Sequence, residues 1–186
     1  MKDKKQKNIL TLGFVLIILL FVMGLFMIFN SDNQKSMVKQ SDTQTMSDKK
    51  FIPEITKSEE EWRALLTPQQ YYILREAGTD IPFDKNDPLL KETRKGTYVT
   101  ADCNEPVFRS EQKFDSGTGW PSFWAPIEGS VVEVEDNTLG ISRTEIVGKK
   151  CGGHLGHVFT DGPKPTGLRY CINSSALKFI PDEIIN

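Results

Sequence analysis

Cys171 has the strongest chemical context in this chain, because a cation and an amide stand at alternate positions around it. Residues 168–173 form a predicted strand, and alternate side chains of a strand share one face. Arg169 would then favour the thiolate of Cys171, and Asn173 would offer hydrogen bonds to a substrate oxygen. The same spacing suits a half-buried structural cysteine beside a surface arginine, and on spacing alone this second interpretation is the stronger.

The two histidines of the chain, His154 and His157, stand three positions apart in the glycine-rich segment 151–161. A His-x-x-His pair can bind a metal when a helix places both rings on one side, but the glycines disfavour a helix here. On a strand the two rings face opposite ways, so we expect them to have different roles. A purely structural role for either ring is the alternative.

A third segment, residues 114–123, reads FDSGTGWPSF and places Gly117 and Gly119 around Thr118. Such a turn can present Trp120 at its tip. An exposed indole there suits an apolar, polarisable group such as a methyl thioether. Burial of Trp120 in the core is an equally good interpretation.

Together, the motifs GTGWPSF, RTEIVGKKCGGHLGHVFTDGP and GLRYCINSSALKF resemble, in order and spacing, the B-type peptide methionine-R-sulfoxide reductases, the MsrB family. The resemblance covers roughly residues 57–181. Three separated motifs in register are far more specific than one short motif. The resemblance implies an enzyme that reduces methionine-R-sulfoxide in oxidised proteins to methionine.

The resemblance also implies a role for each matching position. Cys171 is expected to be the catalytic nucleophile, which becomes a sulfenic acid, and His157 the principal acid and donor to the sulfoxide oxygen. His154 and Asn173 complete the catalytic set. The residues expected to bind the substrate or support its site are Trp120, Phe159, Arg169 and Asp161.

The position of the resolving cysteine of many family members is occupied here by Thr118. The usual internal disulfide with Cys171 therefore cannot form. We expect regeneration by an external thiol reductant, either a thioredoxin-like protein or a small thiol. A resolving role for Cys103 or Cys151 is the alternative.

Many members also bind structural zinc through two Cys-x-x-Cys pairs, and each pair here has lost its first member. Thr100 stands before Cys103 and Gly148 before Cys151. Two thiolates do not complete a tetrahedral zinc site, so we predict no metal and no other cofactor. Because the zinc ligands of relatives converge, the resemblance implies that the two cysteines lie close together. Our hypothesis is that a disulfide between them replaces the metal.

The elements that must position these residues form a mainly β unit over residues 51–186. Capping boxes at Ser58 and Thr67 predict two short helices, the second ending near Gly78. The pattern then changes to short strands, predicted at 97–100, 131–135, 142–147, 158–160 and 168–173. No βαβ rhythm occurs, so we expect two packed antiparallel sheets of MsrB-like type with short N-terminal helices.

Residues 1–30 form a predicted cytoplasmic stub and transmembrane helix that acts as a signal anchor. The run from Ile9 to Phe29 carries no charged residue and is long enough for the ~30 Å hydrocarbon core. Lysines precede it, so we expect the N-terminus inside and the catalytic unit outside a bacterial cytoplasmic membrane. A cleaved signal peptide is disfavoured, because no small-residue cleavage site follows. Residues 31–50 form a predicted flexible linker.

Composition and motif context exclude several other functions. The formal net charge is −2, which offers no basic surplus for nucleic acid. Cysteine, histidine and asparagine are also the parts of a thiol protease, but the sequence around Cys171 does not fit one. A disulfide exchanger would carry a Cys-x-x-Cys pair, and a non-catalytic binding module on this scaffold would not need both Cys171 and Trp120.

Overall fold

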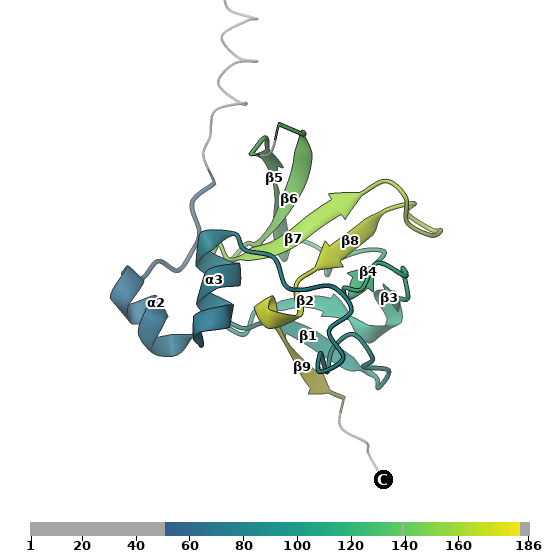
Figure 1. Cartoon of the computed structure of the whole chain (residues 1–186), viewed down its shortest axis with the longest axis horizontal. Helices are drawn as coiled ribbons and strands as arrows, with labels where there is room; N and C mark the ends of the chain where they lie inside the picture. Colours follow the sequence, from purple (N-terminus) through teal and green to yellow (C-terminus); the bar gives the residue numbers. More distant parts are fainter. Residues whose placement is uncertain (1–50, 139, 183–186) are drawn as a thin grey trace, which may run out of the picture. The chain divides into compact units, whose positions relative to one another are not determined.

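A computed structural model describes residues 51–138 and 140–182 (Figure 1). Phe51–Asn186 groups as one compact unit. The predicted stub, anchor and linker at residues 1–50 lie outside the described residues. Within those residues, no helix combines the length and the apolar character needed to cross a bilayer.

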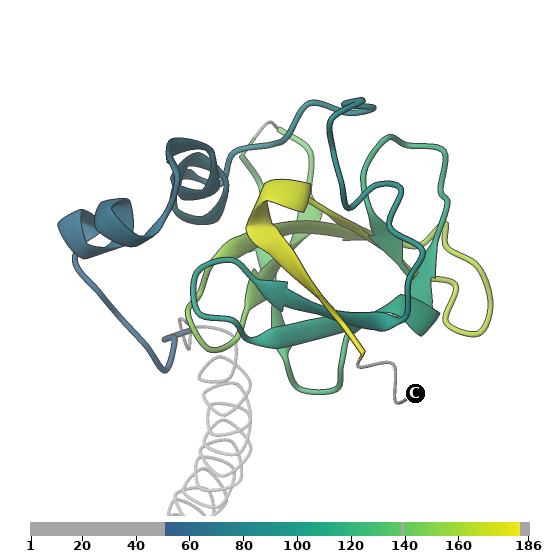
Figure 2. The ribbon, with the colours of Figure 1, turned by 90° about the horizontal axis from the view of Figure 1, so that it is seen from below.

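Both predicted helices form, as α2 (Glu59–Leu65) and α3 (Pro68–Glu76). Each begins with a capping box, in which the side chain of Ser58 or Thr67 accepts a hydrogen bond from the third helical N–H group. Helix α3 ends at Ala77, which takes the left-handed conformation with φ 51° one residue earlier than predicted. Figure 2 shows the two helices together on one side of the sheets.

The strands form two antiparallel sheets, as predicted. The smaller sheet has the order β2-β1-β9 and the larger one the order β3-β4-β8-β7-β6-β5. The smaller sheet consists of β1 (Gly96–Thr100), β2 (Pro106–Arg109) and β9 (Leu177–Pro181). The larger sheet consists of β3 (Lys113–Phe114), β4 (Ser122–Phe123), β5 (Val131–Asp136), β6 (Arg143–Gly148), β7 (His154–Phe159) and β8 (Arg169–Ile172).

Strand β7 begins at His154, whereas the sequence predicts a strand from Val158 only. The earlier residues are extended despite their glycines. Gly156 is needed there because its Cα lies directly against the neighbouring strand, where an added Cβ would clash with the carbonyl oxygen of Cys171. The prediction missed this part of the strand because glycines are uncommon inside strands.

An aromatic cluster joins the two sheets. Phe123 of β4 packs edge-on against Tyr98, with ring centroids 4.9 Å apart, and stacks on Phe108 at 4.3 Å. Tyr170 of β8 approaches the same cluster, 6.1 Å from Phe108. This packing fixes β4 and β8 side by side and determines which face of β8 points away from the core.

Candidate active site

Cys171 lies in β8, and the alternation of that strand determines its direction. Tyr170 and Ile172 are buried, whereas Arg169 and Cys171 are half-buried on the opposite face. The predicted shared face of Arg169 and Cys171 is therefore present. Asn173 lies just beyond the end of the strand and is buried. Cys171 is the one free cysteine in the described part of the chain.

A cavity of about 130 Å³ opens in front of Cys171. It is lined by Thr79, Trp120, Arg143, Gly156, His157, Phe159, Cys171, Ile172 and Asn173. Five residues singled out from the sequence therefore meet here, whereas His154, Arg169 and Asp161 do not line the cavity. Such a cavity suits the end of one side chain and is smaller than usual drug-sized pockets.

The sulfur of Cys171 faces a short chain of hydroxyl groups. Thr118 Oγ1 lies 3.8 Å from Cys171 Sγ, and Ser116 Oγ lies 2.8 Å from Thr118 Oγ1 and 2.7 Å from Ser122 Oγ. Burial raises the pKa of the Cys171 thiol, while hydrogen bonds from Thr118 and Ser122 and the charge of Arg169 act in the opposite direction. The resting residue is a thiol with partners ready to stabilise a thiolate.

The two histidine rings lie on the same side of the sheet, which corrects the prediction that they face opposite ways. Their ring centroids are 5.4 Å apart. Between His154 and Gly156 the register against β6 shifts, which leaves Leu155 as an extra residue in a bulge. A bulge shifts the alternation of a strand by one position, so residues three apart share a face.

Each histidine has its own carboxylate. Nδ1 of His154 lies 2.6 Å from Glu145 Oε1, and Nε2 of His157 lies 2.8 Å from Asp136 Oδ2. Asp136 Oδ2 also accepts a hydrogen bond of 2.5 Å from Arg143 Nη2. Burial lowers the pKa of His157, Asp136 raises it, and the charges of Arg143 and His154 lower it. His157 is therefore held by Asp136 at the edge of the cavity, with buried His154 beside it.

Sequence reasoning missed Asp136 and Arg143, which face each other across the β5–β6 hairpin. Opposite charges at the ends of paired strands were the available signal. Exposed hairpins commonly carry such pairs without any function. Only the fold places this pair against His157.

Asp80, in the segment after α3, is a further residue that the sequence did not reveal. Its carbonyl accepts a 2.9 Å hydrogen bond from Trp120 Nε1, and its N–H donates to Asn173 Oδ1 at 2.8 Å. Its carboxylate accepts two hydrogen bonds of 2.8 Å from Ser175. Asn173 Nδ2 in turn donates to the Leu155 carbonyl at 3.1 Å. These contacts fix the indole and the amide, and they go largely through backbone groups, which leave no sequence signature.

Arg169 is positioned by Asp161 and Phe159. Two parallel hydrogen bonds of 2.9 Å join the guanidinium to the Asp161 carboxylate, and the guanidinium lies 4.4 Å from the centroid of the Phe159 ring. Such a bidentate pair gives the cation one orientation. Asp161 and Arg169 thus act from outside the cavity lining, and the positive charge of Arg169 favours the Cys171 thiolate.

The part of the chain that holds these residues matches a known protein family. The family model described as the SelR domain matches residues 66–181, which include every residue of the cavity. Peptide methionine sulfoxide reductase MsrB of Leptospira interrogans is 55% identical over 127 residues, 68% of this chain and 95% of that protein. The proteins of the same name from Agrobacterium fabrum and Methanosarcina mazei are 55% and 52% identical over 130 residues, 69% of this chain and 95% and 91% of those proteins.

The chain belongs to the MsrB family.

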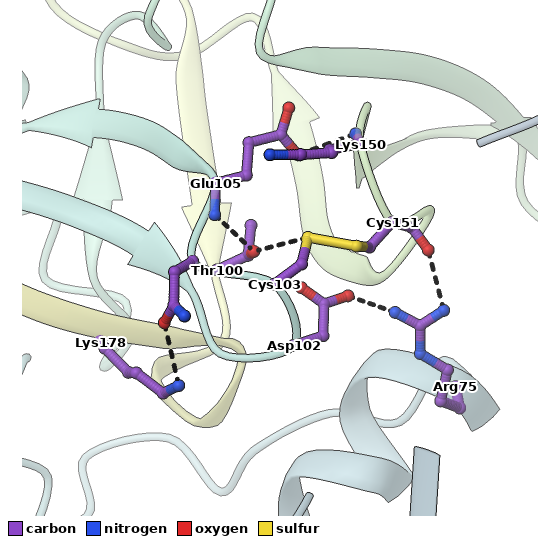
Figure 3. Close-up of a disulfide and its surroundings, with 9 residues drawn as sticks. Arg75, Thr100, Asp102, Cys103, Glu105, Lys150, Cys151 and Lys178 are labelled. Carbon is purple, nitrogen blue, oxygen red and sulfur yellow. Dashed lines mark hydrogen bonds and ion pairs between the residues drawn. A yellow bond between two sulfur atoms is a disulfide. The ribbon is translucent and has the colours of Figure 1, made fainter. Parts of the chain in front are cut away.

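The positions that carry zinc ligands in many MsrB proteins converge here as well. Cys103 and Cys151 are joined in a disulfide with a Cα–Cα distance of 6.4 Å (Figure 3). Thr100 Oγ1 lies 3.6 Å from Cys103 Sγ, and a Cβ added to Gly148 would lie 3.4 Å from Thr100 Cγ2. Neither cysteine lines the cavity in front of Cys171.

The corner formed by Asp102, Cys103 and Cys151 does not offer the ligand set of the zinc site that many MsrB proteins carry. The two sulfur atoms and the Asp102 carboxylate lie within 4.8 Å of one another. However, the sulfurs are bonded to each other, and Asp102 forms an ion pair with Arg75, which also donates to the Cys151 carbonyl at 2.9 Å (Figure 3). A disulfide offers no thiolate, and the carboxylate is already engaged, so a tetrahedral ligand set is absent from this corner.

Proposed function

We propose that this chain reduces methionine-R-sulfoxide in oxidised proteins to methionine, with Cys171 as nucleophile. Membership of the MsrB family makes it a peptide methionine sulfoxide reductase, an oxidoreductase. The observation that carries the mechanism is the cavity of about 130 Å³ that brings together the free thiol of Cys171, the ring of His157 and the indole of Trp120. Sulfoxide sulfur becomes electrophilic as its oxygen gains a proton, so a nucleophile and an acid must share one small site.

In the proposed reaction, Cys171 Sγ attacks the sulfoxide sulfur and forms a transient S–S bond. That bond breaks as the oxygen moves from the sulfoxide sulfur to Cys171 Sγ, so that one S–O bond breaks and another forms. The sulfoxide is reduced by two electrons to the thioether, and Cys171 is oxidised to the sulfenic acid, which retains the oxygen. His157 supplies a proton to that oxygen as the bond breaks, and the proton lost by Cys171 replaces it over the cycle. A thiol then attacks the sulfenic acid, releases water and leaves a mixed disulfide, which a second thiol reduces.

In the resting site, the proton that the sulfoxide oxygen needs lies on Cys171 and not on His157. Burial raises the pKa of Cys171 and lowers that of His157, so a thiol and a neutral imidazole are favoured. Because Asp136 already occupies His157 Nε2, a sulfoxide oxygen that accepts a hydrogen bond from the other ring nitrogen, Nδ1, favours the imidazolium, the only form that donates from both nitrogens. We propose that substrate binding thereby moves the proton from Cys171 to His157 and protects the idle thiol from oxidation.

Three walls of the cavity account for the proposed choice of the R sulfoxide. Cys171 must face the sulfur, His157 the oxygen and Trp120 the methyl group. The methionine side chain, which leads to the polypeptide, is the third substituent on sulfur and must point to the opening. Only one configuration at sulfur satisfies all four directions at once. Asp80 keeps the indole in place through the hydrogen bond from Trp120 Nε1.

We propose an external reductant, either a thioredoxin-like protein or a small thiol, and no zinc or other cofactor. Thr118 stands beside Cys171 where a resolving cysteine would be needed, and its hydroxyl stabilises the thiolate instead. Cys103 and Cys151 are bonded to each other. No second thiol therefore lies ready at Cys171 among the described residues.

We further propose that residues 9–29 anchor the enzyme and place residues 51–186 outside the cytoplasm. The uncharged apolar run and the lysines before it support this topology. The Cys103–Cys151 disulfide also suits an oxidising compartment. Protease added to intact spheroplasts should digest the catalytic unit, and protection until lysis would contradict the topology.

The proposed function is tested with separated R and S methionine sulfoxide peptides and dithiothreitol as reductant. The full chain should convert the R peptide and leave the S peptide unchanged. Conversion of the S form at a similar rate would contradict the stereochemical argument. Absence of turnover with correctly folded protein would contradict the proposed catalysis.

A further inference from the structure

A second hollow, of about 680 Å³, shares Trp120 with the catalytic cavity and none of its other lining residues. The catalytic cavity takes only the end of a methionine side chain. The rest of an oxidised polypeptide must continue along the surface next to that cavity. Because Trp120 borders both spaces, the second hollow lies on the path of a chain whose sulfoxide faces Cys171.

Phe83 borders this hollow and is held in an unusual conformation. Its backbone takes φ 58° and its side chain is 63% exposed. The left-handed region is a strained choice for a large side chain. The Phe83 N–H donates to the Gly119 carbonyl at 3.0 Å, and a Cβ added to Gly119 would come within 2.6 Å of the Phe83 ring. An aromatic ring is thus held open to solvent beside Trp120, which core packing does not explain.

The same hollow contains a lysine that forms no ion pair among the described residues. Arg94 pairs with Glu92 at 2.6 Å, but Lys113 Nζ donates only to the Leu90 carbonyl, at 3.0 Å, in the part of the chain that the structure describes. Burial lowers the pKa of Lys113, and the charges of Asp115, Asp87 and Glu92 offset this only in part. A ligand carboxylate at Nζ would offset that cost, because an opposite charge favours the charged form.

We propose that this hollow is a subsite for the polypeptide that carries the methionine sulfoxide. It takes an apolar side chain against Phe83 and a carboxylate at Lys113, from residues that flank the oxidised methionine. The proposal rests on the function proposed above and names the substrate class that the site prefers. The occupant is the substrate chain, because Trp120, which faces the methyl group, forms the wall between the two spaces.

The experiment compares small and extended R sulfoxides with the full chain and dithiothreitol. The substrates are N-acetyl-methionine sulfoxide methylamide and two peptides that flank the sulfoxide with leucine and either aspartate or lysine. Phe83→Gly removes the ring, and glycine accepts the left-handed backbone without strain. Lys113→Met removes the charge and keeps most of the chain length. Leu65→Ala, at an exposed residue of α2 outside both hollows, is the matched control.

We expect Phe83→Gly to raise KM for the aspartate peptide by roughly 5- to 20-fold, as loss of an aromatic contact does. KM for the small sulfoxide should stay unchanged. Lys113→Met should abolish the preference for the aspartate over the lysine peptide. Equal KM changes for small and extended substrates, or none, would overturn the proposal. So would an effect seen only when a thioredoxin-like protein replaces dithiothreitol, because the hollow would then bind the reductant.

A failure of the proposed function is distinguishable, because the wild-type chain would then reduce none of the three sulfoxides. Calorimetric titration with the methionine forms of the two peptides tests the subsite without turnover. Tighter binding of the aspartate peptide by the wild type than by Lys113→Met supports the subsite. Equal binding by the two proteins would overturn it.

Discussion

The two sulfur sites of this molecule differ in almost every respect except the element. Cys171 is a free, half-buried thiol in front of a cavity, with hydroxyl groups, an arginine and a histidine around it. Cys103 and Cys151 are joined to each other at a corner where a guanidinium and a carboxylate are already paired. One site leaves its sulfur available to a substrate, and the other has no thiol to offer.

The difference shows that the surroundings of a cysteine, more than its presence, decide what it does. Thr118 and Thr100 illustrate this, because a threonine hydroxyl lies near sulfur at both sites. At the cavity the hydroxyl favours a thiolate that has a function, whereas at the corner it lies next to a sulfur that does not titrate. The cavity and its acid, present only around Cys171, make the distinction.

Replacing the cysteines of each site by serine should show the largest difference between the two sites. Cys171→Ser should lower kcat with the R sulfoxide peptide by about 10³-fold or more, because a serine hydroxyl is a far weaker nucleophile there. The Cys103→Ser/Cys151→Ser double variant should keep kcat within about 2-fold of the wild type in dithiothreitol, since neither residue lines the cavity. Loss of turnover in a folded double variant would mean that the corner takes part in the reaction.

Removing the acid should give the next largest effect. His157→Asn should lower kcat by roughly 10²- to 10⁴-fold, the usual contribution of a positioned proton donor. A substrate in which the oxygen on sulfur is already activated as a leaving group needs less protonation. With such a substrate, His157→Asn should recover part of the lost rate. Steady-state kinetics with both substrates checks this, and an equal loss for both would assign His157 a merely structural role.

The corner should matter for stability rather than for chemistry. The disulfide closes a sequence separation of 48 residues, and the chain-entropy estimate for such a loop is about 4 kcal/mol of unfolding free energy. The double serine variant should therefore unfold at lower denaturant concentration than the oxidised wild type. Tryptophan fluorescence in urea without reductant measures the difference. Coincident unfolding curves would show that the disulfide is not a staple.

The smallest expected effect concerns the pH dependence of the acid. Asp136 raises the pKa of His157 while burial lowers it. In Asp136→Asn that pKa falls further, so the imidazolium is lost at lower pH and the alkaline limb of the kcat profile moves toward acid. At pH 8 the rate should drop by about 10-fold, as for a lost charge-assisted hydrogen bond. An unshifted limb with a uniformly lower rate would indicate a packing effect instead.

Local signals in the sequence predicted much of the fold. Capping boxes at Ser58 and Thr67 lie within a few residues and specify their helices. Strands β2, β3, β4 and β9 escaped prediction. The two-residue strands β3 and β4 are too short to show alternation, and β9 and β4 depend on pairing with distant strands. The helices and most strands of the larger sheet were therefore predictable, and the shortest strands and both outer strands of the smaller sheet were not.

The site was predictable only where a side chain itself takes part. The family motifs identified Cys171, His157 and Trp120, which the cavity brings together. The facing of the histidines was predicted wrongly, because a bulge at Leu155 arises from pairing with β6 and leaves no pattern. Asp80 was missed because it acts mostly through its backbone carbonyl and N–H group.

The most direct test of the contrast between the two sulfur sites is a single turnover without reductant. Wild-type chain that holds the Cys103–Cys151 disulfide and a free Cys171 thiol is mixed with excess R sulfoxide peptide. Methionine release and the adduct of a sulfenic acid trap are measured by mass spectrometry. We predict one methionine per chain, with the trap on Cys171 and the Cys103–Cys151 disulfide intact. A second equivalent of methionine, or a disulfide linking Cys171 to Cys103 or Cys151, would contradict the division between a reactive thiol and a structural disulfide.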